Sequence, residues 1–254
     1  MAMSEVKLVL TDLDGTAVYP EAHVVSKAVM DAIHEAESRG VRFCAVTGRP
    51  LWQAKELLKL MGFKDPCILD GGASIVNPLT EETIWSRQLS AEDTKSAVAE
   101  LMQDAFLIEY DQGVKKSGEV DLTTITEPAL SVWASVPADK AEELVEKLRQ
   151  KLPTTAVHGN PGPGGDFSKW GIQVTHKEAD KEHAVKQLLE TLGVDKANTL
   201  AIGDGNNDLP LFNGASIKVA MGNATDLLKA NADYVVGTVQ EDGFAYAIQT
   251  LVLQ

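Results

Sequence analysis

Two aspartates follow a short apolar run near the start of the chain, where residues 9–16 read Val-Leu-Thr-Asp12-Leu-Asp14-Gly15-Thr. Such a run, bounded by turn residues, is typical of a buried strand in a parallel sheet. Carboxylates this close in sequence repel each other unless a cation lies between them. Gly15 lets the chain turn tightly and leaves backbone amides free for an anion. The pattern indicates a site that holds Mg²⁺ against a phosphate, but alone it also fits a solvated acidic turn.

A second acidic cluster lies near the other end of the chain, in Gly203-Asp204-Gly-Asn-Asn207-Asp208, after the apolar run 200–202. Asp204 and Asp208 are four residues apart, so a helix beginning near Asn206 would bring them to the same small volume. Two acidic clusters at strand ends of one chain are not expected by chance. Together they predict one site built from both.

The composition argues against several function classes. The chain has 254 residues, of which 44% are apolar and 24% charged, and its net charge is −14. This charge argues against binding to nucleic acid or to anionic membranes, both of which need a basic face. No apolar stretch reaches the roughly 20 residues of a membrane helix, and no secretory signal is visible. We expect a cytoplasmic protein, a monomer or weak homodimer, that binds a small-molecule phosphate ester.

Strand and helix patterns alternate through the first 70 residues. The expected elements are a strand over residues 6–10, a helix from Ser26 to Gly40, a strand over 41–47, a helix from Pro50 to Gly62 and a strand over 67–69. This order predicts a Rossmann-like parallel sheet that binds ligands outside the carboxyl ends of its strands. Cys44 and Cys67 lie in these apolar strands and are interpreted as small buried hydrophobic residues.

The pattern changes after about residue 75. Strands are expected over residues 84–85, 106–110, 120–125, 131–136 and 169–175, with helices beginning at Ser90 and Pro137. Alternation resumes with a helix from Asp180 to Leu192. The fold class is therefore α/β, with a discontinuous core over residues 1–79 and 179–254 and an α+β cap domain inserted as a lid over residues 80–178.

Four short motifs, in order, resemble those of the haloacid dehalogenase superfamily, and most closely its Cof-like sugar phosphatase branch. They are Asp12-Leu-Asp14-Gly-Thr16, Thr47-Gly48-Arg49, Lys181 at the head of a helix, and Gly203-Asp204-Gly-Asn-Asn207-Asp208. The similarity continues through Val219-Ala-Met-Gly-Asn223-Ala, so it covers nearly the whole core. It implies that the protein hydrolyses a phosphomonoester, a sugar or polyol phosphate, through an aspartyl-phosphate intermediate.

The resemblance also implies a role for each motif residue. Asp12 would be the nucleophile and Asp14 the general acid and base, with its backbone carbonyl on Mg²⁺. The implied metal residues are Asp12, Asp14, Asp204 and, orienting metal-bound water, Asp208. The implied phosphate-binding residues are Thr47, Gly48, Lys181 and Asn207. Arg49 either reaches the substrate or pairs with a surface carboxylate.

Two departures from the motifs concern the substrate more than the reaction. Gly71 stands where the branch usually has asparagine, and Glu182 follows Lys181 where it usually has glycine. Core packing is favoured for the tryptophans Trp52, Trp85, Trp133 and Trp170, while His158 and Lys169 are candidate lid contacts. The rival functions are a phosphomannomutase-like phosphomutase, which would need a basic lid, and a catalytically silent phosphate-binding protein.

Overall fold

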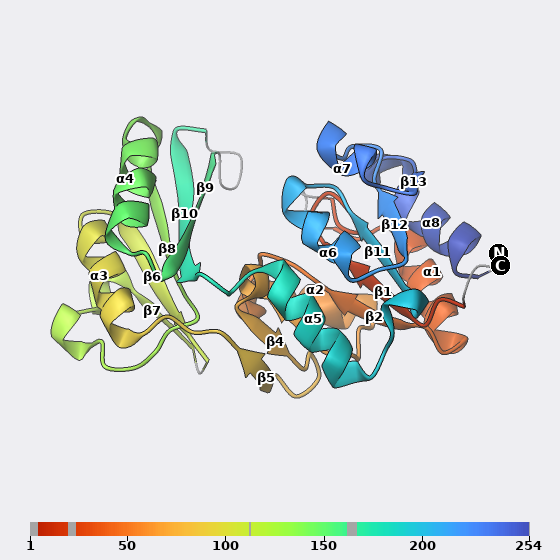
Figure 1. Ribbon diagram of the computed structural model, residues 1–254, viewed down its shortest axis with the longest axis horizontal. Coiled ribbons are helices and arrows are strands. Elements are labelled where there is room, and N and C mark those ends of the chain that lie inside the picture. The colour runs from red at the N-terminus through yellow and green to blue at the C-terminus, as the bar shows by residue number, and fades with distance from the viewer. Residues whose placement is uncertain (1–4, 20–23, 112, 162–166, 254) are drawn as a thin grey trace. The chain divides into compact units, whose positions relative to one another are not determined.

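The structure is a computed structural model that describes residues 5–19, 24–111, 113–161 and 167–253. Contacts divide the chain into two compact units (Figure 1). Unit 1 comprises Met1–Trp85 and Lys181–Gln254, and unit 2 comprises Ser86–Asp180. Unit 2 is therefore inserted in the sequence of unit 1. Unit 1 extends past residue 79 because the segment that follows forms a further strand of one of its sheets.

Unit 1 contains a parallel sheet with the strand order β13-β12-β11-β1-β2. In chain order the elements of this unit are β1 (Leu8–Thr11), α1 (Lys27–Ser38), β2 (Arg42–Ala45), α2 (Leu51–Met61), β3 (Cys67–Leu69), β4 (Ser74–Val76), β5 (Thr83–Ser86), α5 (Lys181–Leu192), β11 (Thr199–Gly203), α6 (Leu209–Asn213), β12 (Ile217–Ala220), α7 (Asp226–Ala230), β13 (Tyr234–Val235) and α8 (Gly243–Leu251). The predicted Rossmann-like α/β core is confirmed. Because its strands are parallel, their carboxyl ends meet at one edge of the sheet.

The burial of β1 fits its interior place in this sheet, between β11 and β2. All four residues of β1 are buried, and Val9 pairs with Leu200 on one side and Phe43 on the other. A strand that is apolar on both faces needs helices on both faces of the sheet. The first of these helices begins where expected, since Ser26 Oγ accepts the N–H of Val29 at 3.1 Å.

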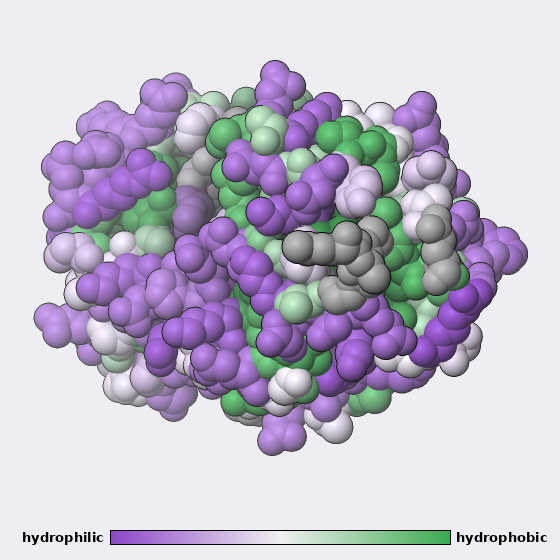
Figure 2. All heavy atoms as spheres, turned by 45° about the vertical axis from the view of Figure 1, so that its right-hand side comes forward, coloured by the Kyte–Doolittle hydropathy of each residue, from purple (hydrophilic) through white to green (hydrophobic). Residues whose placement is uncertain are grey.

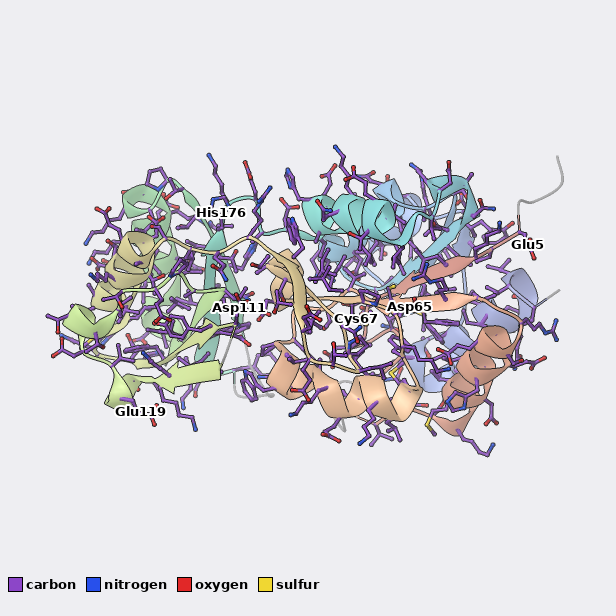
Figure 3. The ribbon with its side chains drawn as sticks, turned by 90° about the horizontal axis from the view of Figure 1, so that it is seen from below. Glu5, Asp65, Cys67, Asp111, Glu119 and His176 are labelled. Carbon is purple, nitrogen blue, oxygen red and sulfur yellow. The ribbon has the colours of Figure 1, made fainter. Side chains whose placement is uncertain are left out.

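The two cysteines are buried free thiols, as predicted. Burial raises the pKa of Cys67 to about 12, which keeps it protonated. Asp65 precedes Cys67 by two residues, and both are labelled in Figure 3. The carboxylate of Asp65 accepts a hydrogen bond from Arg42 Nε at 2.7 Å, which ties the start of β3 to β2.

Unit 2 is an antiparallel sheet with the strand order β7-β6-β8-β10-β9. Its elements are α3 (Ala91–Leu101), β6 (Ala105–Tyr110), β7 (Gly113–Lys116), β8 (Ser131–Pro137), α4 (Ala138–Lys151), β9 (Thr155–Pro161) and β10 (Lys169–His176). Helices α3 and α4 lie on one side of this sheet in Figure 1. Buried residues such as Ile108, Val132 and Val174 form a second apolar core with these helices.

One predicted strand of unit 2 is wrong. Residues 120–125 contain a short 3₁₀ turn, Leu122–Thr124, in place of a strand. The side chain of Asp121 accepts the N–H of Thr123 at 2.8 Å and so caps that turn. A side chain that hydrogen-bonds to nearby backbone competes with sheet pairing, and here the Asp121 bond favours the turn over a strand.

The core packing expected for the tryptophans is also only partly correct. Trp85 packs against the apolar core of unit 1 and Trp170 against that of unit 2. Trp52, in the first turn of α2, is 48% exposed and is not a core residue.

The surface seen in Figure 2 is mainly hydrophilic, with smaller hydrophobic patches. Within the part of the chain that the structure describes, no helix has both the length and the apolar character to cross a membrane.

Candidate active site

Lys181 lies between two carboxylates at the carboxyl edge of the parallel sheet. Its Nζ donates to Asp12 Oδ1 at 2.9 Å and to Asp208 Oδ1 at 2.7 Å. Asp12 directly follows β1 and is 7% exposed, while Lys181 begins α5 and is 4% exposed. The two acidic motifs from opposite ends of the sequence therefore meet in one buried ion cluster. Lys181, whose role only the family resemblance implied, belongs to the same cluster.

The cluster has three carboxyl groups, Asp12, Asp204 and Asp208, and Lys181 can offset the charge of only one. Burial raises the pKa of Asp12 to about 8, although the positive charge of Lys181 acts to lower this pKa. Burial also raises the pKa of Asp204 to about 6, and the charge of Asp208 adds to the effect. Burial acts to lower the pKa of Lys181, but the negative charges of Asp12 and Asp208 together raise it above the ordinary value. The site favours an additional cation.

The donor set fits a hard divalent cation. Asp12, Asp204 and Asp208 each offer a carboxylate oxygen, and these oxygens lie within 4.8 Å of one another. Clustered carboxylate oxygens are the ligands that Mg²⁺ prefers. Asp208 has a further task, because its Oδ2 accepts the N–H groups of Asp204 at 3.0 Å and Gly205 at 2.9 Å. It therefore orients both Lys181 and the turn that carries Asp204.

Two glycines allow the acidic segments to approach each other. Gly15 has φ +80°, and a Cβ there would lie 2.3 Å from Asp204 Oδ2. At Gly203 a Cβ would lie 2.6 Å from the Cβ of Asp208. Any side chain at either position would collide with a predicted metal residue.

Asp14 is not part of the carboxylate cluster. Its Oδ2 accepts Arg49 Nε at 2.7 Å, and Arg49 Nη2 forms a second bond with Oδ1. Arg49 thus pairs with a carboxylate, but that carboxylate belongs to Asp14, the predicted general acid and base. The Arg49 side chain is only 12% exposed. This bidentate pair fixes the orientation of the Asp14 carboxylate.

The Thr47 turn follows β2 and is held by the segment after β3. Thr47 Oγ1 accepts the N–H of Arg49 at 3.1 Å, and Thr47 O accepts the N–H of Gly71 at 3.0 Å. The neighbouring Asp70 is buried with φ +54°. Gly48 is exposed at this turn, and Asn207 is exposed beside Gly205. The structure thus brings the predicted phosphate-binding residues to the strand ends that carry the aspartates.

Two residues of the site were named in the sequence motifs, but the sequence reasoning gave them no role. Thr16 Oγ1 donates to Asp204 Oδ1 at 3.2 Å. Asn223 Nδ2 donates to Gly15 O at 2.8 Å and to Asp204 Oδ2 at 3.2 Å, and its Oδ1 accepts the N–H of Val239 at 2.9 Å. Asn223 thereby joins the two acidic segments. Its place in a Gly-Asn turn after an apolar strand was the signal that could have indicated this role.

Comparison with known proteins agrees with this site. A sequence model of the family described as haloacid dehalogenase-like hydrolase matches residues 9–112 and 106–248. The 5-amino-6-(5-phospho-D-ribitylamino)uracil phosphatase YcsE of Bacillus subtilis is 29% identical over 98% of this chain and 97% of its own length. A phosphoglycolate phosphatase of Methanopyrus kandleri is 28% identical over 96% of this chain and 97% of its own length.

Solved structures share the fold. A haloacid dehalogenase-like hydrolase from Bacteroides thetaiotaomicron superposes with a TM-score of 0.84 at 24% identity, covering 96% of this chain and 99% of that one. A sugar phosphatase of haloacid dehalogenase subclass IIB has a TM-score of 0.77 at 22% identity, covering 96% of this chain and 98% of that one.

Proposed function

Because the chain belongs to the haloacid dehalogenase-like hydrolases, we propose that it is a Mg²⁺-dependent phosphomonoester hydrolase that works through an aspartyl-phosphate on Asp12. The observation that carries this proposal is the buried Lys181, which bonds to Asp12 and Asp208 at the strand ends where Asp204 also lies. Its substrate is a small phosphorylated metabolite, a sugar or polyol phosphate. Two relatives named as phosphatases support this reaction class.

Asp12 performs the first half of the reaction. One of its oxygens attacks phosphorus, the bond from phosphorus to the ester oxygen breaks, and the departing alcohol takes a proton from Asp14. Lys181 supplies a fixed positive charge beside the attacking carboxylate, and Thr47, Gly48 and Asn207 supply hydrogen-bond donors for the phosphoryl oxygens. Positioning and charge stabilisation account for most of phosphoryl-transfer catalysis.

Water completes the cycle. Its oxygen attacks the phosphorus of the aspartyl-phosphate while Asp14 takes its proton, and the bond to Asp12 breaks to release inorganic phosphate. Asp12, Asp204 and Asp208 would hold the divalent cation, with the backbone carbonyl of Asp14. When bound, this cation supplies Lewis-acid charge that lowers the repulsion between the phosphate and the nucleophile.

The test is phosphate release from para-nitrophenyl phosphate during a Mg²⁺ titration. Wild-type protein should turn over with Mg²⁺ and stop in excess chelator, and Asp12→Asn should be inactive while keeping its fold by circular dichroism. Asp31→Asn is the matched control, because Asp31 is exposed on α1 and pairs with Lys27 on the same helix, away from the aspartate cluster. Turnover by the Asp12 variant, or turnover without metal, would refute the proposal.

A further inference from the structure

Asn223 has an exposed side chain whose amide nitrogen and oxygen both bond within the protein. It lies in the turn after β12. Its Nδ2 donates to Gly15 O at 2.8 Å and to Asp204 Oδ2 at 3.2 Å. Its Oδ1 accepts the N–H of Val239 at 2.9 Å. Because the side chain is exposed, packing in the core does not account for these three contacts.

The backbone partners fix the orientation of the Asn223 amide. A carbonyl oxygen can only accept, so the amide nitrogen faces Gly15 O, and a backbone N–H can only donate, so the amide oxygen faces Val239. The amide nitrogen has two hydrogens, one for Gly15 O and one for Asp204 Oδ2. A hydroxyl has one hydrogen and a carboxylate has none, so neither could form this set of bonds. The position therefore selects asparagine over serine, threonine or aspartate.

The contacts of Asn223 span three neighbouring strands of the parallel sheet (Figure 1). β1 pairs with β11 and β11 pairs with β12, so the turn after β12 reaches across the end of β11 to the segment after β1. Asp204 follows β11, and Asp12 and Gly15 follow β1. Asn223 therefore sets the spacing between the two segments that supply the carboxylate cluster.

Backbone hydrogen bonds on both sides of Asn223 hold its turn in place. Met221 N donates to Gly203 O at 3.0 Å, and Thr225 N donates to Asp204 O at 3.0 Å. These bonds fix the turn against the end of β11. The Asn223 amide thus reaches the two acidic segments from a defined position.

Asp204 depends on neutral donors more than the other carboxylates of the cluster do. Lys181 bonds to the other two, whereas Asp204 forms no ion pair among the residues that the structure describes. Its Oδ1 accepts Thr16 Oγ1 at 3.2 Å, and its Oδ2 accepts Asn223 Nδ2 at 3.2 Å. Groups that hydrogen-bond to a metal-binding side chain orient it, and their loss lowers metal affinity.

We propose that Asn223 is a positioning residue for the cation site of unit 1. It holds Asp204 against the segment after β1, so that the carboxylates are in place before the cation binds. This inference rests on the proposed Mg²⁺-dependent reaction and deepens it. In this role Asn223 contacts neither the substrate nor the attacking oxygen, so its loss should weaken cation binding more than turnover of the loaded enzyme.

The test is calorimetric titration of Mg²⁺ into metal-free wild type, Asn223→Ala and Asn223→Ser. Asn223→Ala should raise the Kd for Mg²⁺ about tenfold or more. Asn223→Ser should also raise it, because one hydroxyl hydrogen cannot serve both acceptors. At saturating Mg²⁺, kcat for para-nitrophenyl phosphate should stay within about threefold of the wild type. Asn223 is exposed, so neither substitution leaves a cavity and both variants should fold.

Two control variants separate positioning from a general loss of stability. Asn231→Ala removes another exposed asparagine, whose Nδ2 donates to Leu227 O at 2.8 Å. Thr238→Ala removes a hydroxyl that donates to Glu241 Oε2 at 3.0 Å, in the turn that contains Val239. Thr238→Ala should lower the Tm measured in chelator. Both controls should leave the Kd for Mg²⁺ within about twofold of the wild type.

Three results would overturn the inference. The first is a Kd for Mg²⁺ in Asn223→Ala within about twofold of the wild type. The second is an equal rise of the Kd in Thr238→Ala, which would indicate general loosening of the fold. The third is a loss of kcat at saturating Mg²⁺ with an unchanged Kd, which would place Asn223 at the substrate. Failure of the proposed function would appear differently, as a wild type that binds Mg²⁺ and releases phosphate from no ester.

Discussion

The guanidinium of Arg49 holds the carboxylate of Asp14, with Nε donating to Oδ2 at 2.7 Å and Nη2 bonding to Oδ1. The two residues come from the segments after β1 and β2, which are adjacent in the parallel sheet. A planar fork fixes both the position and the plane of a carboxylate, which lysine cannot do. We infer that Arg49 is a positioning residue for the proposed acid and base.

Arg49→Met should therefore affect poor leaving groups most. An alkyl phosphate needs a proton from Asp14, so its kcat should fall about tenfold or more. Para-nitrophenolate leaves without a proton, so kcat for its ester should change by less than about threefold. A plot of log kcat against leaving-group pKa measures this. Arg39→Met is the control, since Arg39 pairs with Glu35 on the exposed face of α1. An equal loss for all leaving groups would contradict a positioning role.

Substitution of Asp14 and substitution of Asp204 should impair the activity in different ways. Asp14→Asn should lower kcat on an alkyl phosphate by about 10² to 10⁴ and leave the half-saturating Mg²⁺ concentration nearly unchanged, because the Asp14 carboxylate lies outside the oxygen cluster. Asp204→Ala removes one oxygen of that cluster and should raise the Mg²⁺ requirement. Mg²⁺ titrations of both variants measure this. Rescue of the Asp14 variant by Mg²⁺, but not of the Asp204 variant, would reverse the assigned roles.

The raised pKa values predict how the metal-free protein responds to pH. The pKa is about 8 for Asp12 and about 6 for Asp204 in the folded chain, against roughly 3.9 when unfolded. Between these values the folded state binds more protons than the unfolded state, so the free energy of unfolding should decrease as pH rises from about 4 to about 8. Mg²⁺ requires deprotonated carboxylates, so its affinity should increase over the same range.

Denaturant titrations of wild type and Asp12→Asn, in chelator at pH 5, 6, 7 and 8, measure the decrease. Taking the difference between the two proteins removes the contribution of the other titrating groups. The wild type should lose more stability than the variant as pH rises, and added Mg²⁺ should restore more at pH 8 than at pH 5. Parallel stability curves for the two proteins would show that Asp12 has no raised pKa.

Gly15→Ala should damage the site more than the backbone conformation alone explains. Gly15 and Gly40 have similar φ values, +80° and +87°, but a Cβ meets nothing within 4 Å at Gly40 and lies 2.3 Å from Asp204 Oδ2 at Gly15. Gly40→Ala should cost about 1–2 kcal/mol of stability through its backbone conformation alone. Gly15→Ala should cost more and raise the Mg²⁺ requirement. Equal Tm losses and an unchanged Mg²⁺ requirement would refute the steric argument.

The parts of the site that could be predicted were those that a short stretch of sequence specifies. Asp12 and Asp204 each directly follow an apolar strand and have a glycine within three residues, so both could be predicted at the sheet edge where the structure has them. The Arg49–Asp14 pair and the Asn223 bridge depend on which strands are neighbours, and that order is set by tertiary packing. The strand expected over residues 120–125 failed because Asp121 caps a turn there, a local bond that apolar alternation does not reveal.

The sheet of unit 2 shows the same limit. Glu109, Ser131 and Gln173 are ordinary polar residues of alternating strands, and only the register of β6, β8 and β10 shows that they form one surface. Their burial could not be read from the alternation, which predicts a solvated face.

The most direct test of the central claim is chemical trapping of the phosphorylated enzyme. Protein mixed with ³²P-labelled para-nitrophenyl phosphate and Mg²⁺ is quenched in acid within milliseconds, and the labelled peptide is sequenced. The account predicts label on Asp12, more of it in Asp14→Asn because the water step is slowed, and none in Asp12→Asn. Label on another residue, or phosphate release by Asp12→Asn at the wild-type rate, would contradict it.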